Sequence, residues 1–498
     1  MSKRPLLNVI PNFVGVGAGM IFPLLFNIIY YRLLGTEAYG LIGFYAALAI
    51  LASFADLGLS QTTLREVARS ASDHDRGREL RPLVLTLVSA ASGIGLLVGV
   101  LTAVSSQWLA TSWLDSSRLS VREITTAIAM MGAILALVFP ANVFNAVLRA
   151  LQLQVLGNAI SVVTAAFRGI ATIAALWIFG ATPMTFFSAQ LLLSAFEVSL
   201  LGTVVWRRLP KSSTLLRFDL KMFRTSWRFA SAVWVSTLIG QLIMLSDKVV
   251  MSKLLPLELF GLYSLAFAVA STVQRLVTPF SNAYLPHFVE LVEKENHELL
   301  SRTYNLASRL ASSVVMCAGL LMLIYAQPIM LLLTGNTANS ATIAPIFAIM
   351  VAANTLGSLM VLPQMLQLAC GAPWIVLRIN LFQAIPYVLL LVLLAPRFGM
   401  YALAGLWLAT TIVSFPVMTA MTHQLAMQGQ AWGWFKGAIL LPACATVTIL
   451  FAGALALPEP SPVGVLPWLV LNYAVALAAA LLSAFWGQSS LFRLLGSR

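Results

Sequence analysis

Long apolar stretches recur along this chain from end to end. Each is about 20 residues long, the length that a helix needs to cross the hydrocarbon core of a bilayer, and short polar links separate them. Hydrophobic residues make up 60% of the 498 positions and charged residues only 9%, which no soluble domain of this size shows. The pattern predicts an all-α polytopic membrane protein with no sizeable soluble domain. About 14 transmembrane helices are expected, centred near residues 21, 49, 96, 137, 165, 194, 239, 272, 319, 355, 384, 412, 446 and 474.

Lysine and arginine residues are concentrated in every second link between these stretches. The N-terminus and the links after the second, sixth and eighth predicted helices are basic, and the odd-numbered links are poorer. Because basic links stay on the cytoplasmic side, both termini are predicted to be cytoplasmic. The net charge of +13 then faces anionic lipid headgroups, and the basic runs lack the interleaved aromatic residues of a nucleic-acid site. The three cysteines have no metal-ligand spacing, so no metal or cofactor is expected.

Two segments of the chain match when they are shifted by 221 residues. The sequence RLLGTEAYGLIGF at 32–44 lies over KLLPLELFGLYSL at 253–265, with Glu37 over Glu258 and Gly40 over Gly261. Each segment would join the first two helices of a six-helix half. Both halves begin on the cytoplasmic side, and parallel halves around a central cavity are a transporter arrangement. The predicted boundaries are 1–206 for the N-terminal half, 207–228 for a basic cytoplasmic linker, 229–430 for the C-terminal half, and 431–498 for an accessory helix pair with the C-terminus.

Polar side chains recur at helical spacing in several of the predicted helices. Positions i, i+3, i+4 and i+7 share one face, so such a stripe gives a membrane helix one polar face that can contact water. Polar faces on several helices predict a shared water-filled cavity, although separate buried hydrogen-bonding patches would produce the same pattern. The candidate cavity residues are Asn142, Asn145, Trp234, Gln241, Gln274, Asn282 and Tyr387.

The charged side chains within the predicted helices are mostly cationic. Ionisable groups at this depth are costly, face cavities or one another, and mark functional sites. Cations from both halves would suit an anionic substrate, since guanidinium is well matched to phosphate. The candidate phosphate-binding residues are Arg32, Arg149, Arg168, Lys248 and Arg275.

Three acidic residues, Asp56, Glu197 and Asp247, are candidates for coupling transport to a proton or a sodium ion. Glu197 has a second interpretation, because it and Arg168 lie near the middle of consecutive predicted helices and could form a structural ion pair. A carboxylate beside a cation usually keeps its charge. That argues mildly against Glu197 as a proton carrier.

The chain resembles the polysaccharide (O-antigen type) flippases of the multidrug/oligosaccharidyl-lipid/polysaccharide (MOP) exporter superfamily. The resemblance covers nearly the whole chain and is carried by the 14-helix plan, the two halves, the opening segment NVIPNFVGVGAGMIFPLLFNIIYYRLLGTEAYGLIGF and the sequence FADLGLSQTTLREVAR at 54–69. These motifs include no catalytic signature, so the resemblance implies a transporter and not an enzyme.

Such flippases move an undecaprenyl-pyrophosphate-linked oligosaccharide, as an O-antigen or exopolysaccharide repeat unit, between leaflets. The resemblance implies alternating access in the bacterial cytoplasmic (inner) membrane, from the inner to the outer leaflet. The cations would then hold the pyrophosphate, and the polar cavity residues would contact the sugars. Membrane lipids, a polysaccharide polymerase and chain-length machinery are the expected partners.

Three alternatives stay open. A flippase for a lipid-linked peptidoglycan precursor would also carry a pyrophosphate lipid. A cation-coupled exporter of the same superfamily would need an acidic cavity, which the sign of the charges disfavours. A membrane enzyme, such as a polysaccharide polymerase or ligase, would need a large external loop or an external acidic group. The one Asp-x-Asp sequence, at 73–75, lies in a predicted cytoplasmic loop rich in arginine.

Overall fold

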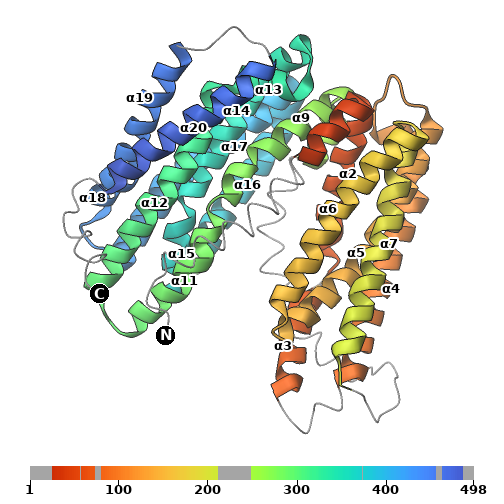
Figure 1. Cartoon of the computed structure of the whole chain (residues 1–498), viewed down its shortest axis with the longest axis horizontal. Helices are drawn as coiled ribbons and strands as arrows, with labels where there is room; N and C mark the ends of the chain where they lie inside the picture. Colours follow the sequence, from red (N-terminus) through yellow and green to blue (C-terminus); the bar gives the residue numbers. More distant parts are fainter. Residues whose placement is uncertain are drawn as a thin grey trace. The chain divides into compact units, whose positions relative to one another are not determined.

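The fold is described from a computed structural model for residues 25–56, 58–72, 80–210, 248–372, 374–455 and 462–485. Within these ranges, eleven helices are long and apolar enough to cross a membrane, and two shorter apolar helices cover Leu25–Leu34 and Pro467–Ser483. They occur where the apolar runs predicted them, and the chain is an all-α, multi-pass membrane protein (Figure 1). The helix centres predicted near residues 21 and 239 lie outside the described residues.

The chain divides into two compact units. The first unit is Leu25–Leu262, and the second contains the described residues from Tyr263 onward. These two units are defined by contacts within the chain, and they do not test the six-helix halves and the linker expected from the sequence. Those domain boundaries therefore stay predictions.

The first unit is a bundle of long helices. α4 and α5 pack along one another, and α7 packs on both α5 and α6 (Figure 1). α5 begins with a capping box in which Ser120 and Glu123 satisfy each other's backbone N–H groups, and Pro183 occupies the first turn of α7, where its missing N–H costs nothing. The helices of this unit are α2 Thr36–Phe54, α3 Leu59–Ser72, α4 Leu80–Trp108 with a π-helical end at Leu109–Trp113, α5 Val121–Ala150, α6 Gln154–Phe179 and α7 Pro183–Arg208.

A turn separates α2 from α3. Gly58 in this turn has φ +76°, a left-handed conformation that glycine adopts without steric cost. Asp56 caps α3, since its carboxylate accepts hydrogen bonds from the backbone N–H of Ser60 (3.3 Å) and from the Ser60 hydroxyl (2.9 Å). The turn thereby fixes the position of Ser60.

The two segments of the internal repeat lie against one another in the first unit. α9 (Leu257–Ala270) begins here. A Cβ atom at Gly40 would lie 2.3 Å from the carbonyl oxygen of Leu257, and one at Gly261 would lie 2.1 Å from that of Thr36. Thr36 and Leu257 are themselves equivalent in the repeat. The contact is therefore reciprocal, and the missing side chains let the two backbones approach.

The carboxylate of Glu37, at the start of α2, is buried in a loop. Glu37 is 5% exposed and accepts hydrogen bonds from five donors. These donors are the Ser116 hydroxyl, the N–H and hydroxyl of Ser117, and the N–H groups of Arg118 and Leu119. A carboxylate held by this many donors fixes the loop to α2.

The same loop also contacts the second repeat segment and the residue that precedes it. The N–H of Leu257 donates to the carbonyl oxygen of Asp115 (2.7 Å), and the indole N–H of Trp113 donates to the Ser252 hydroxyl (3.1 Å). Residues 113–119 thus tie the beginnings of α2 and α9 together; we call them the clamp loop.

Glu37→Gln is expected to lower the melting temperature of the purified protein. Glutamine has one acceptor oxygen instead of two and turns its NH₂ group toward N–H donors, and a buried donor left unpaired costs about 1–3 kcal/mol. Glu123→Gln is the control, because Glu123 is exposed and glutamine also completes a capping box. Equal melting temperatures for the two variants would show that Glu37 does not hold the clamp loop.

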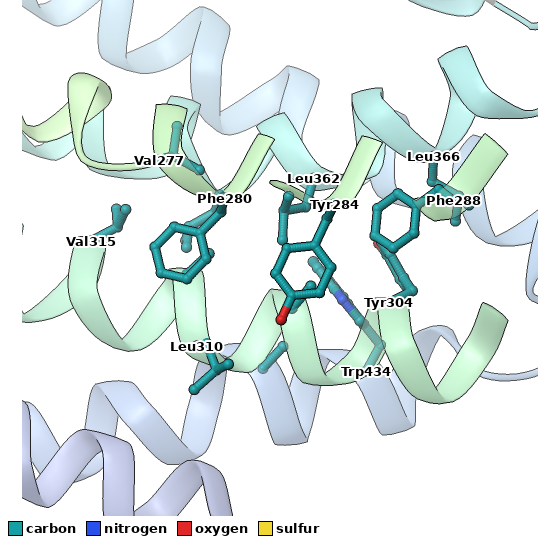
Figure 2. Close-up of a cluster of buried hydrophobic side chains, with 14 of the residues drawn as sticks. Val277, Phe280, Tyr284, Phe288, Tyr304, Leu310, Val315, Leu362, Leu366 and Trp434 are labelled. Carbon is teal, nitrogen blue, oxygen red and sulfur yellow. The ribbon is translucent and has the colours of Figure 1, made fainter. Parts of the chain in front are cut away.

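The second unit packs around a core of aromatic side chains. Figure 2 shows Phe280, Tyr284 and Phe288 along α11, next to Tyr304 of α12 and Trp434 of α18. The cavity in this core has a volume of about 10 Å³, room for about one water molecule. The helices are α10 Thr272–Arg275, α11 Thr278–Glu293, α12 His297–Ile324, α13 Ala326–Thr334, α14 Thr337–Leu359, α15 Val361–Ala369, α16 Trp374–Phe398, α17 Met400–Ala426, α18 Ala431–Phe435 with a π-helical end at Lys436–Leu440, α19 Leu441–Leu455 and α20 Pro462–Phe485.

The span predicted near residue 272 is interrupted twice. α9 ends at Ala270, α10 is a single turn, and α11 begins at Thr278. Pro279 lies in the first turn of α11, where a proline fits, whereas inside a continuous helix it would remove a hydrogen bond. The candidate cavity residues Gln274 and Asn282, both predicted on this span, therefore lie on separate helical segments, α10 and α11.

Candidate functional site

A polar cavity lies in the first unit, where the first turn of α3 meets the last turns of α5 and the first turns of α6. Its volume is about 400 Å³. The lining residues are Ser60, Asn142, Asn145, Arg149, Gly157, Asn158 and Ser161. We call it the α5–α6 cavity.

Helical spacing explains how α5 and α6 present these groups. Asn142, Asn145 and Arg149 are three and four residues apart, so they share one face of α5, and Asn158 and Ser161 share one face of α6 in the same way. Gln152, with φ +58°, lies in the short connection that reverses the chain between the two helices. The three residues that the sequence predicted on α5 are thus brought together in one cavity.

The lining combines one cation with neutral hydrogen-bonding groups. Arg149 is exposed in the last turn of α5, and its guanidinium can pair with a phosphate through two N–H groups. The amides of Asn142, Asn145 and Asn158 both donate and accept, which suits the hydroxyl groups of a sugar. The cavity can therefore hold a polar ligand that carries an anionic group.

Asp56 acts on the cavity through Ser60. Burial raises the pKa of the Asp56 carboxyl, and the two hydrogen bonds from Ser60 oppose that rise. Asp56 does not itself line the α5–α6 cavity. Its role as a coupling residue stays a prediction.

Arg168 of α6 and Glu197 of α7 form an ion pair. A structural ion pair was one of the two interpretations of these residues from the sequence, and the structure contains it. The side chains are 29% and 24% exposed, so neither is fully buried. One turn further along, the Gln190 amide donates to the Thr172 hydroxyl (3.2 Å), which adds a second polar contact between the same helices.

One face of α6 connects the cavity with this ion pair. Asn158, Ser161, Arg168 and Thr172 follow at intervals of three, seven and four residues, so they form a stripe along one side of the helix. The opposite side carries the exposed apolar residues Val163, Phe167 and Ile170, as expected for a face in contact with lipid. We call the polar side the α6 stripe.

The chain matches the family described as polysaccharide biosynthesis protein over residues 6–292, more than half of its length. It belongs to that family. Among solved structures, the lipid II flippase MurJ in an inward closed conformation has a TM-score of 0.69 at 11% identity, over 98% of this chain and 99% of that chain. None of the curated protein sequences matches.

Two further solved structures are similar. A multidrug resistance MATE family transporter of the MOP superfamily, in an inward-facing conformation, has a TM-score of 0.64 at 14% identity over 82% of this chain and 96% of that chain. A MOP superfamily transporter from Pyrococcus furiosus has a TM-score of 0.54 at 16% identity over 84% and 96%. This polysaccharide biosynthesis protein thus has the fold of the MOP-superfamily transporters.

The other residues predicted for its site have different locations. In the first unit, Arg32 is exposed and Lys248 is half-buried. In the second unit, Gln274, Arg275 and Asn282 are exposed, and Tyr387 is buried, with 4% of its surface exposed. Trp234, Gln241 and Asp247 lie outside the described residues. A joint site for these residues with Arg168 stays a prediction.

Sequence reasoning missed four residues of the cavity. Asn158 and Ser161 were detectable from the sequence, because their spacing puts them on the α6 stripe with Arg168. Ser60 and Gly157 carried no comparable signal. Ser60 lines the cavity only because the turn at Gly58 and the cap by Asp56 direct the start of α3 toward α5 and α6.

Proposed function

We propose that this protein is a flippase for an undecaprenyl-pyrophosphate-linked oligosaccharide, an O-antigen or exopolysaccharide repeat unit. It would move this lipid from the inner to the outer leaflet of the bacterial cytoplasmic membrane by alternating access. Membership of the polysaccharide biosynthesis family and the MOP fold support a transporter of a lipid-linked substrate. The α5–α6 cavity is the observation that carries the proposal.

The chemistry of the cavity fits the two polar parts of such a lipid. A volume of about 400 Å³ is in the range of small-molecule sites, enough for part of an oligosaccharide. The asparagine amides would bind sugar hydroxyls, and Arg149 would bind the pyrophosphate. The polyprenyl chain, which is as apolar as the lipid tails, stays in the bilayer beside exposed apolar residues such as Val163 and Ile170.

The distribution of basic links supports cytoplasmic access to the cavity. The cavity lies at the end of the first unit that includes the links after the second and fourth predicted helices, on the predicted cytoplasmic side. The crossing of Gly40 and Gly261 lies near the other end of α2, a helix of 19 residues and so roughly 28 Å long. The crossing and the clamp loop would therefore lie on the outer side of the membrane.

The membrane potential would drive an anion in this direction. A potential negative inside favours outward movement by about 2.3 kcal/mol per charge per 100 mV. A pyrophosphate that keeps two net charges would gain roughly 5 kcal/mol at that voltage. Coupling to a proton or sodium ion, with Asp56, Glu197 or Asp247 as the carrier, is the alternative.

The runner-up is a flippase for a lipid-linked peptidoglycan precursor, whose pyrophosphate would fit Arg149 equally well. The similarity to MurJ concerns the fold alone at 11% identity. The two candidates differ in the sugars that the cavity would bind.

Complementation in two bacterial strains tests the proposal and separates it from the runner-up. One strain lacks the flippase of its surface glycan pathway, with the cognate glycan machinery present, and the other is depleted of its peptidoglycan-precursor flippase. We expect the protein to restore surface glycan in the first strain and not to restore growth in the second. Rescue of the second strain alone, at matched membrane levels of protein, would contradict the proposal.

A further inference from the structure

The ion pair between Arg168 and Glu197 is placed where an unpaired charge is costly. Each residue lies near the middle of its transmembrane helix, α6 or α7. Charged groups at this depth pair with one another or face a wet cavity. An arginine that binds a substrate anion here needs another partner whenever the substrate is absent.

The surroundings of the pair leave access from the α6 stripe. On the side of α6 away from the stripe, Phe167 and Phe196 contact one another, with ring centroids 5.9 Å apart, and each immediately precedes a member of the pair. Both rings are about half exposed, as expected beside lipid. The remaining exposure of Arg168, 29% of its side chain, is therefore accessible to a polar ligand that follows the stripe.

The stripe also gives the distance between the ion pair and the α5–α6 cavity. Ser161, which lines the cavity, precedes Arg168 by seven residues, or about 10 Å along the helix. A ligand of a few sugars and a pyrophosphate is long enough to contact both places. At the cavity end it would meet the exposed residues Ser161 and Asn158.

We propose that Glu197 is a resident counter-ion that a phosphate group of the substrate displaces from Arg168 during translocation. In the unloaded protein, the Glu197 carboxylate neutralises Arg168. A phosphate that has moved along the α6 stripe replaces the carboxylate, since guanidinium pairs with either anion in the same two-point geometry. When the substrate leaves, Glu197 returns and helps to expel it. This inference rests on the proposed function, and it assigns Glu197 to phosphate exchange instead of ion coupling.

The exchange has a consequence for affinity and rate. A competing anion lowers the affinity for the substrate and speeds its release. Glu197→Gln keeps a hydrogen-bond acceptor for Arg168 and removes the competing charge. The variant should bind a pyrophosphate lipid more tightly and transport it more slowly, whereas a variant with mere structural damage would bind more weakly.

Binding of farnesyl pyrophosphate, a short soluble polyprenyl pyrophosphate, tests the inference on the full-length purified protein. Dissociation constants are measured for the wild type, Glu197→Gln, Glu197→Asp and Arg168→Ala/Glu197→Gln, with Glu123→Gln as the control and farnesol and inorganic pyrophosphate as comparison ligands. We expect Glu197→Gln to bind roughly tenfold more tightly than the wild type, because one charge-assisted contact changes a dissociation constant by about that factor. Glu197→Asp should restore the wild-type value, and the double variant should lose the gain.

The possible results separate this inference from the function on which it rests. If the wild type binds farnesyl pyrophosphate and Glu197→Gln binds it equally or more weakly, Glu197 is not a displaceable counter-ion, and the proposed function still stands. If the gain survives in the double variant, Arg168 is not the phosphate partner and the inference fails. If neither protein binds the probe above farnesol, both the inference and the pyrophosphate substrate are contradicted.

Discussion

Gly40→Ala and Gly261→Ala are each expected to lower the melting temperature by a few degrees and to remove most of the transport activity. The new Cβ atom would lie 2.3 or 2.1 Å from a backbone carbonyl oxygen of the facing helix, so the helices have to move apart. Overpacking of this kind costs about 1–3 kcal/mol. Because the partner is backbone, no side-chain rotation relieves the clash, and the close crossing is lost.

Gly93→Ala is the matched control for these two variants. Gly93 lies in α4 of the same unit, and a Cβ atom there would meet nothing within 4 Å. Alanine favours a helix over glycine by about 1 kcal/mol, so this variant should melt at the wild-type temperature or slightly above it. If all three variants melted alike, the repeat segments would not cross closely at Gly40 and Gly261.

Arg149→Ala is expected to reduce the initial rate of transport by about 100-fold. The guanidinium is the one cation that lines the described α5–α6 cavity, and loss of a charge-assisted contact of about 3 kcal/mol changes a rate or affinity by that factor. Arg149→Lys should recover part of the rate, because it keeps the charge and loses the two-point geometry.

The control for Arg149 is on the same helix. Arg122→Ala removes an exposed arginine from the first turn of α5, far from the cavity, and should transport at the wild-type rate. Rates are compared at equal amounts of protein in the membrane. If Arg149→Ala and Arg122→Ala transport equally well, the cavity does not bind the anionic part of the substrate.

The positions of the membrane helices could be predicted from the sequence, because the length of each apolar run alone determines them. The same reasoning predicted Asn142, Asn145 and Arg149 as one group, because one face of one helix carries all three. It could not choose between the two interpretations of Arg168 and Glu197, since that depends on how α6 and α7 are rotated against each other.

Other features depend on contacts that no local pattern reports. The repeat made Gly40 and Gly261 equivalent, but equivalence does not require that the two segments touch. Ser60 belongs to the cavity because of a left-handed turn at Gly58. The breaks between Ala270 and Thr278 place Gln274 and Asn282 on separate helical segments.

Reconstituted translocation tests most directly whether this chain moves a pyrophosphate-linked oligosaccharide across a bilayer. Purified protein is placed in liposomes with the labelled lipid, and the fraction that becomes accessible from the other leaflet is followed over time, with labelled phosphatidylglycerol as the comparison lipid. We expect the wild type to move the oligosaccharide lipid and not phosphatidylglycerol, and Arg149→Ala to move neither. Wild-type protein that moves both lipids equally, or moves neither, would contradict the proposed function.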